Sequence, residues 1–203
     1  SPNAQVLYIH PSFSTITEAS KLYQSENQFV FCHEELTKLS LPRGSFDFLW
    51  IRKTLEFEPD PRAAFDCLTD HLISGGELLV EEYDRRLLNH YPVPIHIESQ
   101  LHEIEDKAEK AKRWTPKIGS ELFSFASEDG FNNIKTEIHP QAYSGERISS
   151  DELQMFEQWF CQMQAAQKEQ IITLSFDLSV FKREFLSFIE NPQRFSYNSL
   201  MRL

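Results

Sequence analysis

Glycine is scarce in this sequence. The 203 residues contain only six, at positions 44, 75, 76, 119, 130 and 145, and no two of them form a G-x-G pair. A glycine-rich loop that lets backbone amides approach a bound nucleotide closely is therefore missing. Cysteine is also scarce: residues 32, 67 and 161 are far apart and odd in number. They indicate reduced thiols in a cytoplasmic protein rather than a disulfide framework.

Basic residues are few as well. Twenty Lys and Arg stand against 31 Asp and Glu, which gives a net charge of −11. This balance argues against nucleic-acid phosphate as the main partner. The apolar runs are strand-sized, far short of the roughly 20 residues of a membrane span. The opening SPNAQ shows no signal peptide, so we expect a cytoplasmic protein.

What the sequence does contain is a strand–helix–strand pattern from Ser45 to Asp84. Phe46 to Ile51 is continuously apolar, Asp60 and Pro61 open a helix, and Gly75-Gly76 precede a second apolar run at Leu78 to Val80. Such a crossover places its two strands parallel in one sheet and predicts that both are buried.

The same stretch resembles the second half of a class I S-adenosylmethionine-dependent methyltransferase. The matching segments are Phe46-Asp47-Phe48, Thr54-Leu55-Glu56, Pro59-Asp60-Pro61, Ser74-Gly75-Gly76 and Glu81 to Asp84. The preceding residues are similar to the second and third strands of that family. RWTPKIGSELFSFASEDGF, later in the chain, resembles a helix of the ubiquinone and menaquinone methyltransferases. The resemblance implies a Rossmann-like α/β fold with a mostly parallel sheet and a late antiparallel edge strand.

The resemblance also implies an N-terminally shortened fold, because the family's first strand and glycine-rich loop have no counterpart. Residues 5 to 9, QVLYI, predict a buried strand, and two placements stay open for it. In one placement QVLYI is the family's second strand, and the family's first strand and the loop after it are absent. In the other, QVLYI has taken the position of the first strand in the middle of a shortened sheet. We expect one domain, 1–203, in which about 86–114 is a helical cover insertion.

Helix signals predict the remaining elements. Capping-box pairs open helices at Thr15 and at Ser149, and Thr115-Pro116 open another. The remaining predictions are a helix at Glu98 to Arg113, a strand at Asn133 to Tyr143, a helix at Leu178 to Ile189 and an edge strand at Arg194 to Leu203.

The resemblance assigns a cofactor and a site. The cofactor is S-adenosylmethionine, and its contacts fall on residues at the ends of the first strands and of the central strand. His10 stands at the family's acidic ribose position, although a neutral imidazole cannot accept from a diol as a carboxylate does. The cofactor-binding residues implied are His10, Ser12, Glu34, Glu35, Leu36 and Arg52, and those for the substrate are Tyr83, Asp84 and Tyr91. Residues Glu81 to Asp84 include candidates for a general base.

Three functions follow. The first is a methyltransferase acting on a small molecule, and the second is a methyltransferase-like partner or regulatory protein that has lost cofactor binding. The third is a binding module for another apolar ligand. We expect no metal, because His10, His33 and Glu34 lack close ligand spacing. A small molecule or a protein partner, without nucleic acid, is expected; homo-oligomerisation and the catalytic residues stay open.

Overall fold

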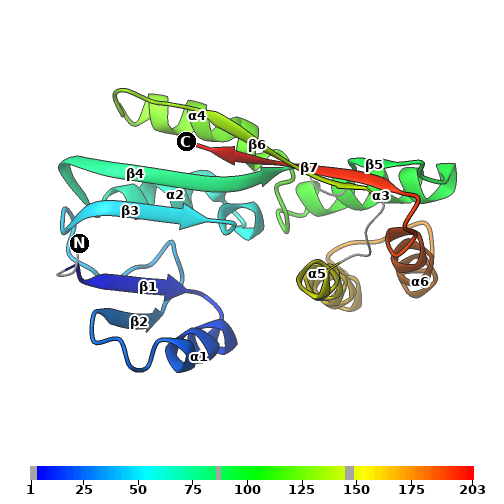
Figure 1. Ribbon diagram of the computed structural model, residues 1–203, viewed down its shortest axis with the longest axis horizontal. Helices are drawn as coiled ribbons and strands as arrows, with labels where there is room; N and C mark the ends of the chain where they lie inside the picture. Colours follow the sequence, from blue (N-terminus) through cyan, green and yellow to red (C-terminus); the bar gives the residue numbers. More distant parts are fainter. Residues whose placement is uncertain (1–3, 86–87, 145–148) are drawn as a thin grey trace. The chain divides into compact units, whose positions relative to one another are not determined.

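The computed structural model describes residues 4–85, 88–144 and 149–203. Its elements in order are β1 (Val6–His10), α1 (Phe13–Leu22), β2 (Phe29–His33), β3 (Phe46–Arg52), the short 3₁₀ helix η1 (Leu55–Phe57), α2 (Pro61–Thr69), β4 (Leu72–Asp84), β5 (His90–Tyr91), α3 (Ile95–Lys110), α4 (Ile118–Glu128), β6 (Glu137–Ser144), α5 (Ser150–Lys168), α6 (Leu178–Ile189) and β7 (Phe195–Arg202) (Figure 1).

Two compact units can be distinguished. The N-terminal unit contains Ser1–Leu49 and Arg62–Leu78, and the C-terminal unit contains Trp50–Pro61 and Leu79–Leu203. Strands β3 and β4 contribute residues to both units. The expected single domain stays a prediction.

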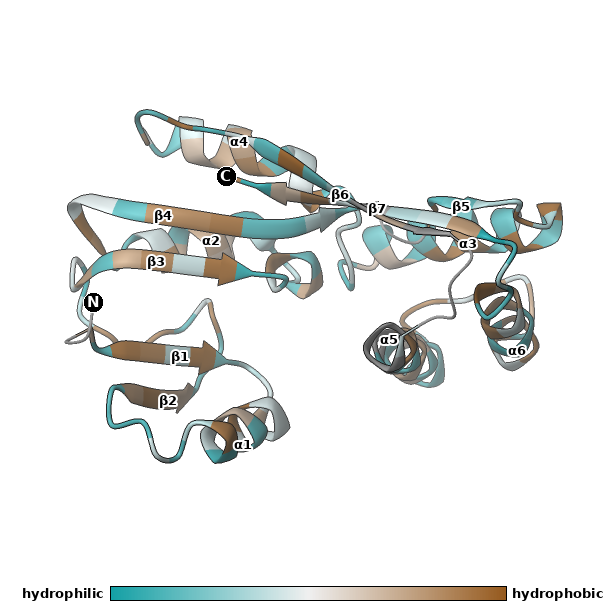
Figure 2. Ribbon diagram, viewed as in Figure 1, coloured by the Kyte–Doolittle hydropathy of each residue, from teal (hydrophilic) through white to brown (hydrophobic). Residues whose placement is uncertain are grey.

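The N-terminal unit contains a parallel pair of short strands, β1 and β2, in register from Val6 beside Phe29 to His10 beside His33. Both strands are strongly hydrophobic (Figure 2). Tyr8 is nevertheless 37% exposed and Val30 54% exposed. The prediction that QVLYI is buried was therefore wrong, because Val6 and Tyr8, which project from one face of β1, are each 37% exposed.

Local capping decides where the first helix begins. Helix α1 starts at Phe13 because the Ser12 side chain accepts a hydrogen bond from the backbone N–H of Thr15. The predicted capping box at Thr15 lies inside the helix, two residues after its true start. Helix α2 starts at Pro61 as predicted, since proline fits the first helical turn.

Strands β3 and β4 are neighbours in the second sheet and run in the same direction (Figure 1). β4 begins at Leu72, earlier than the apolar run predicted, and it includes Gly75 at φ +81°. The burial prediction for β3 was wrong on one face: Ile51 is buried, but Phe48 is 48% and Trp50 52% exposed.

The C-terminal unit contains the antiparallel part of this sheet. β7 pairs with β4 from Glu81 beside Arg202 to Asp84 beside Ser199, and with β6 along its whole length. β7 is antiparallel as expected, but it lies inside the sheet and β6 takes the edge beside it. The strand order is therefore set by pairing that the sequence pattern does not encode.

A large hydrophobic core lies in the C-terminal unit. Helices α3, α5 and α6 share it, and its completely buried side chains include Ile104, Phe160, Phe181 and Phe185. The apolar stripe of α3 is fully covered in this core.

Most predicted bounds shifted: α3 begins at Ile95 rather than Glu98, α4 at Ile118 rather than Thr115, and β6 at Glu137 rather than Asn133, whereas α6 has the predicted bounds.

No helix in the described residues is both long and apolar enough to cross a membrane.

Candidate functional site

The first part of the expected site lies at the carboxyl end of β1, in the N-terminal unit. His10 Nδ1 accepts a hydrogen bond from the backbone N–H of Ser12 at 2.9 Å. The proton of the neutral ring must therefore be on Nε2. Burial, together with the nearby His33, lowers the pKa of His10. At neutral pH this imidazole offers a hydrogen-bond donor at Nε2 and no further acceptor.

The other cofactor residues expected in this unit have local roles. The Ser12 side chain caps α1. Glu34 Oε2 accepts from the backbone N–H of Ser40 at 2.8 Å, and exposed Glu35 forms an ion pair with Lys38 at 2.5 Å. Leu36 is only 4% exposed. The structure thus places all of these residues in the N-terminal unit.

The second part of the expected site lies in the C-terminal unit, where β3 and β4 end. Open parallel sheets bind ligands at this edge. Glu82, a candidate base from the sequence, is completely buried, and its Oε1 accepts from the backbone N–H groups of Thr54 at 2.7 Å and Leu55 at 2.9 Å. We infer that Glu82 fixes the turn after β3 and is not available as a base.

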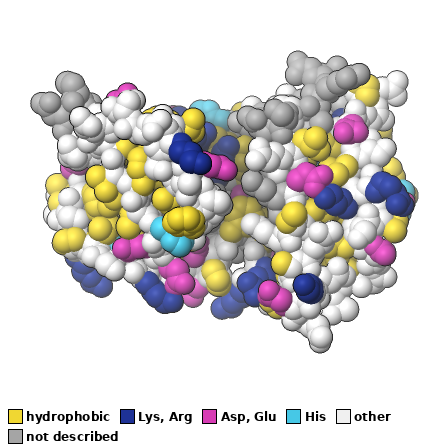
Figure 3. Space-filling view, turned by 90° about the horizontal axis from the view of Figure 1, so that it is seen from below, with side chains coloured by type: hydrophobic (Ala, Val, Ile, Leu, Met, Phe, Trp, Pro, Cys, Tyr) yellow, Lys and Arg dark blue, Asp and Glu magenta, His cyan; other side chains and the backbone are white. Residues whose placement is uncertain are grey.

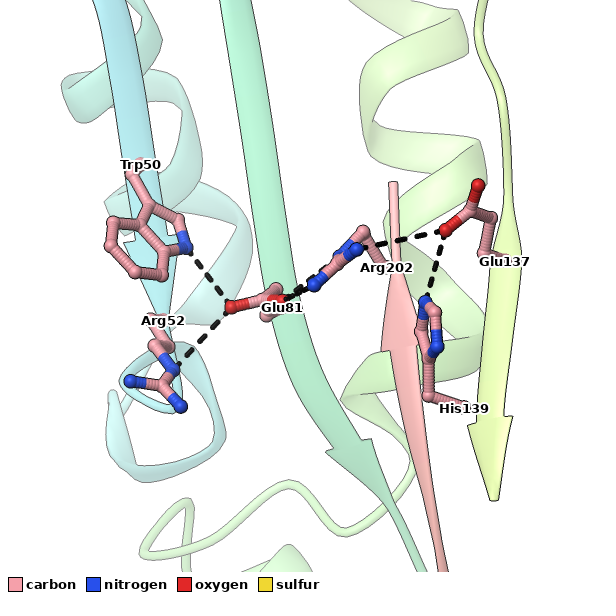
Figure 4. A network of polar contacts seen from close by, with 6 residues as sticks. All are labelled: Trp50, Arg52, Glu81, Glu137, His139 and Arg202. Carbon is pink, nitrogen blue, oxygen red and sulfur yellow. Dashed lines mark hydrogen bonds and ion pairs between the residues drawn. The ribbon is translucent and has the colours of Figure 1, made fainter. Parts of the chain in front are cut away.

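Glu81 is the centre of a polar network (Figure 4). Its carboxylate accepts from Trp50 Nε1 at 3.1 Å and from Arg202, and Arg52 Nε lies 3.4 Å away. Arg202 continues to Glu137 at 3.7 Å. Burial alone would raise the pKa of Glu81, but these partners hold it below its usual value. Arg52, an expected cofactor residue, is therefore positioned through Glu81.

The three expected substrate residues do not lie together: Tyr83 and Asp84 are on β4, and Tyr91 is on β5. Tyr83 is buried beneath the Lys53 ammonium, whose Nζ lies 4.6 Å from the ring centre. Asp84 Oδ1 accepts from the backbone N–H of Ser120 at 3.3 Å. On β7, Asp84 pairs with Ser199, and Tyr91 of β5 pairs with Phe195. Phe195 and Ser199 are four residues apart on the strand, or roughly 13 Å. Tyr91 is 72% exposed and is thus distant from the other two.

Glu105 on α3 joins this edge, and the sequence analysis missed it. Burial is the main cause that raises its pKa to about 7, and the negative charges of Glu109 and Asp84 add to the effect. Arg85 and Lys117 act in the opposite direction. Its Oε1 is buried without a hydrogen-bond partner. Only the tertiary contact with the end of β4 distinguishes Glu105 from the other acids of this charged helix.

The described residues contain no group of three His, Cys, Asp or Glu side chains arranged to hold a metal ion. His10 and His33 are register neighbours, but His33 Nε2 lies 3.0 Å from the Pro11 carbonyl oxygen.

Comparison with known proteins identifies the fold. Residues 1–80 match the family described as "Methyltransferase domain". A Bacillus halodurans protein assigned as a methyltransferase superposes with a TM-score of 0.57 at 11% identity, covering 98% of this chain and 81% of that one. The chain has a methyltransferase fold. No curated protein matches it significantly.

Two further structures show how widely this fold is used. Phosphoethanolamine N-methyltransferase 2 from Haemonchus contortus, solved with phosphomonomethylethanolamine and S-adenosylhomocysteine, has a TM-score of 0.51 at 14% identity, covering 98% of this chain and 44% of that one. The [4+2]-cyclase SpnF has a TM-score of 0.50 at 15% identity, covering 98% and 66%. The methyltransferase-like fold therefore does not by itself fix the reaction.

Proposed function

We propose that this methyltransferase-like protein binds S-adenosylmethionine and transfers its methyl group to a small molecule. The observation that carries the proposal is the set of polar groups at the carboxyl ends of β3 and β4, in a chain whose first 80 residues match a methyltransferase domain. Methyl transfer needs alignment of acceptor, methyl carbon and sulfur more than covalent help. The protein's task is therefore to hold two ligands in line.

The residues of the N-terminal unit that would hold the cofactor are those expected from the sequence. His10 can donate from Nε2 to a ribose hydroxyl, and the Glu34 carboxylate, which already bonds the Ser40 N–H and the Cys32 thiol, can also accept from the adenine amine. Glu35 is already paired with Lys38, which makes it the weaker candidate. Sulfonium chemistry comes from the cofactor itself once it is bound.

Glu105 is our candidate for the group that takes the acceptor's proton. A base works best when its pKa lies near the ambient pH, and burial brings the Glu105 carboxyl into that range at about 7. Its unpartnered Oε1 can accept without first breaking a hydrogen bond. A carbon-13 titration of the carboxyl tests this assignment, and a midpoint at the ordinary value near 4.5 would contradict it.

The alternative is a non-catalytic partner or regulatory protein. An exposed apolar face on residues 97–111 or 153–163 would favour that alternative. Ile97, Leu101, Phe156 and Phe160 are instead buried in the protein's own core, so these two helices give the partner role no support. The absence of a G-x-G pair remains the feature that favours the alternative.

Calorimetric titration with S-adenosylmethionine and S-adenosylhomocysteine tests the proposal. We expect micromolar binding, or about −8 kcal/mol. Glu34→Gln should weaken it, whereas Glu18→Gln on α1 is the matched control. No binding at millimolar ligand would overturn the proposal and favour the partner role.

The ribose assignment has its own test. His10→Asp replaces a donor by a carboxylate that can accept from both ribose hydroxyls, so the affinity for S-adenosylmethionine should rise. An unchanged affinity would contradict the placement of His10 at the ribose.

A further inference from the structure

Two basic residues occupy equivalent positions where neighbouring strands end. Lys53 directly follows Arg52, the last residue of β3, and Arg85 directly follows Asp84, the last residue of β4. β3 and β4 are adjacent and run in the same direction, so both residues lie at the carboxyl edge of the sheet (Figure 1).

The backbone at both positions is in the left-handed region. Lys53 has φ +51° and Arg85 has φ +48°. This conformation costs a non-glycine residue about 1 kcal/mol or more, and such strain gathers at functional sites. A glycine or asparagine would relieve it, yet the chain has a long cation in each place.

In the described residues neither side chain forms an ion pair at contact distance, although the charge of Glu105 acts on Arg85. Some of the other described cations form ion pairs, such as Arg43 with Asp70 and Lys110 with Asp106. No ion pair joins Lys53 or Arg85 to any carboxylate in the described part of the chain. Lys53 lies over the Tyr83 ring instead, and the backbone N–H of Arg85 donates to the Pro116 carbonyl.

The geometry brings the two cations within reach of one ligand. The Lys53 backbone N–H donates to the Glu81 carbonyl, so Lys53 lies beside Glu81 of β4. From Glu81, β4 continues for about three residues, or roughly 10 Å, to its end at Asp84, just before Arg85. The Lys53 side chain covers part of this length by reaching forward over Tyr83. Glu105, the acid whose charge acts on Arg85, is about half protonated near its pKa of about 7 and therefore neutralises Arg85 only in part.

We propose that Lys53 and Arg85 form an anion subsite that holds a carboxylate or phosphate group of the methyl acceptor. Lysine supplies a point charge and arginine a fork of donors, and the two together suit either group. The proposal names the substrate class of the proposed methyltransferase and therefore rests on that function, but its test needs no cofactor.

The test is a titration of the nitrogen-15-labelled chain with inorganic phosphate and, separately, with acetate, followed by amide chemical shifts. We expect saturable shifts at residues 52–54 and 83–85 in the millimolar range. Lys53→Gln and Arg85→Gln should each weaken binding about fivefold or more, because each removes a charge-assisted contact. Preference for phosphate or for acetate tells which group the acceptor carries.

Lys112→Gln is the matched control. Lys112 is also a cation with positive φ, +53°, but it follows α3 rather than a strand. Non-saturable shifts in the wild-type chain, or equal weakening by Lys112→Gln, would overturn the subsite. Phosphate binding without binding of S-adenosylmethionine would instead contradict only the proposed methyl transfer.

Discussion

The strands of the N-terminal unit and the helical core of the C-terminal unit differ in how completely they cover their apolar side chains. In the N-terminal unit, Tyr8, Val30 and Phe48 are all more than one third exposed. Hydrophobic side chains also lie at the surface in the part of Figure 3 where Figure 1 shows β2 and α1. In the C-terminal unit, Phe181 and Phe185 are completely buried among aromatic neighbours. This difference shows that a run of apolar residues is buried in a core only where several helices and strands pack against it.

The largest expected effect concerns the aromatic core. Phe185→Ala should lower the free energy of unfolding by about 3–5 kcal/mol, because it leaves a cavity among packed rings. Val30→Ala, at an exposed strand position, should change it by less than about 1 kcal/mol. Urea denaturation followed by circular dichroism measures both. Equal effects would refute the contrast between the units.

The next effect is a pH dependence from His90, whose Nδ1 lies 2.7 Å from Ser196 Oγ between β5 and β7. Burial, then the nearby Arg194, lowers the pKa of His90 to about 4. Above pH 6.5 neither state binds the proton. Between pH 6.5 and 4 only the unfolded state does, so stability should fall by up to about 3 kcal/mol.

Denaturation curves over this pH range measure the loss, and His90→Gln is the comparison. The variant should lack that component of the slope. An identical pH dependence in both proteins would show that His90 is not held neutral.

Glu81 and Glu35 compare a buried carboxylate with an exposed one. Glu81→Gln should cost about 1–3 kcal/mol, because it removes the charge that Arg202, Trp50 and Arg52 share. Glu35→Gln breaks only an exposed pair with Lys38 and should change nothing measurable. Thermal denaturation distinguishes them, and a neutral Glu81→Gln would mean that the network contributes no stability.

The smallest effects concern helix caps. Asp177 Oδ1 accepts from two backbone N–H groups of α6, at 2.7 and 3.1 Å, whereas the single Ser12 contact is 3.4 Å long. Asp177→Ala should therefore cost about 1 kcal/mol and Ser12→Ala about half as much. The reverse order, measured by chemical denaturation, would contradict this comparison.

Local chemistry made several elements predictable. Asp60-Pro61 predicted the start of α2, and the bounds of α6 at Leu178 and Ile189 are those predicted. Capping side chains and the apolar period act within a few residues, so the sequence reveals them directly. The Rossmann-like methyltransferase fold, predicted from the resemblance of the crossover unit, was confirmed by the comparison with a solved structure.

The sequence by itself determined the α/β class, the crossover from β3 to β4 and the acids and bases placed at the strand ends. Only the tertiary structure decided that β7 lies between β4 and β6, that Glu82 caps a turn and that Glu105 takes a pKa of about 7. Strand order and side-chain environment depend on residues far apart in the chain. A local pattern cannot encode them, because burial and pairing arise only when distant segments meet.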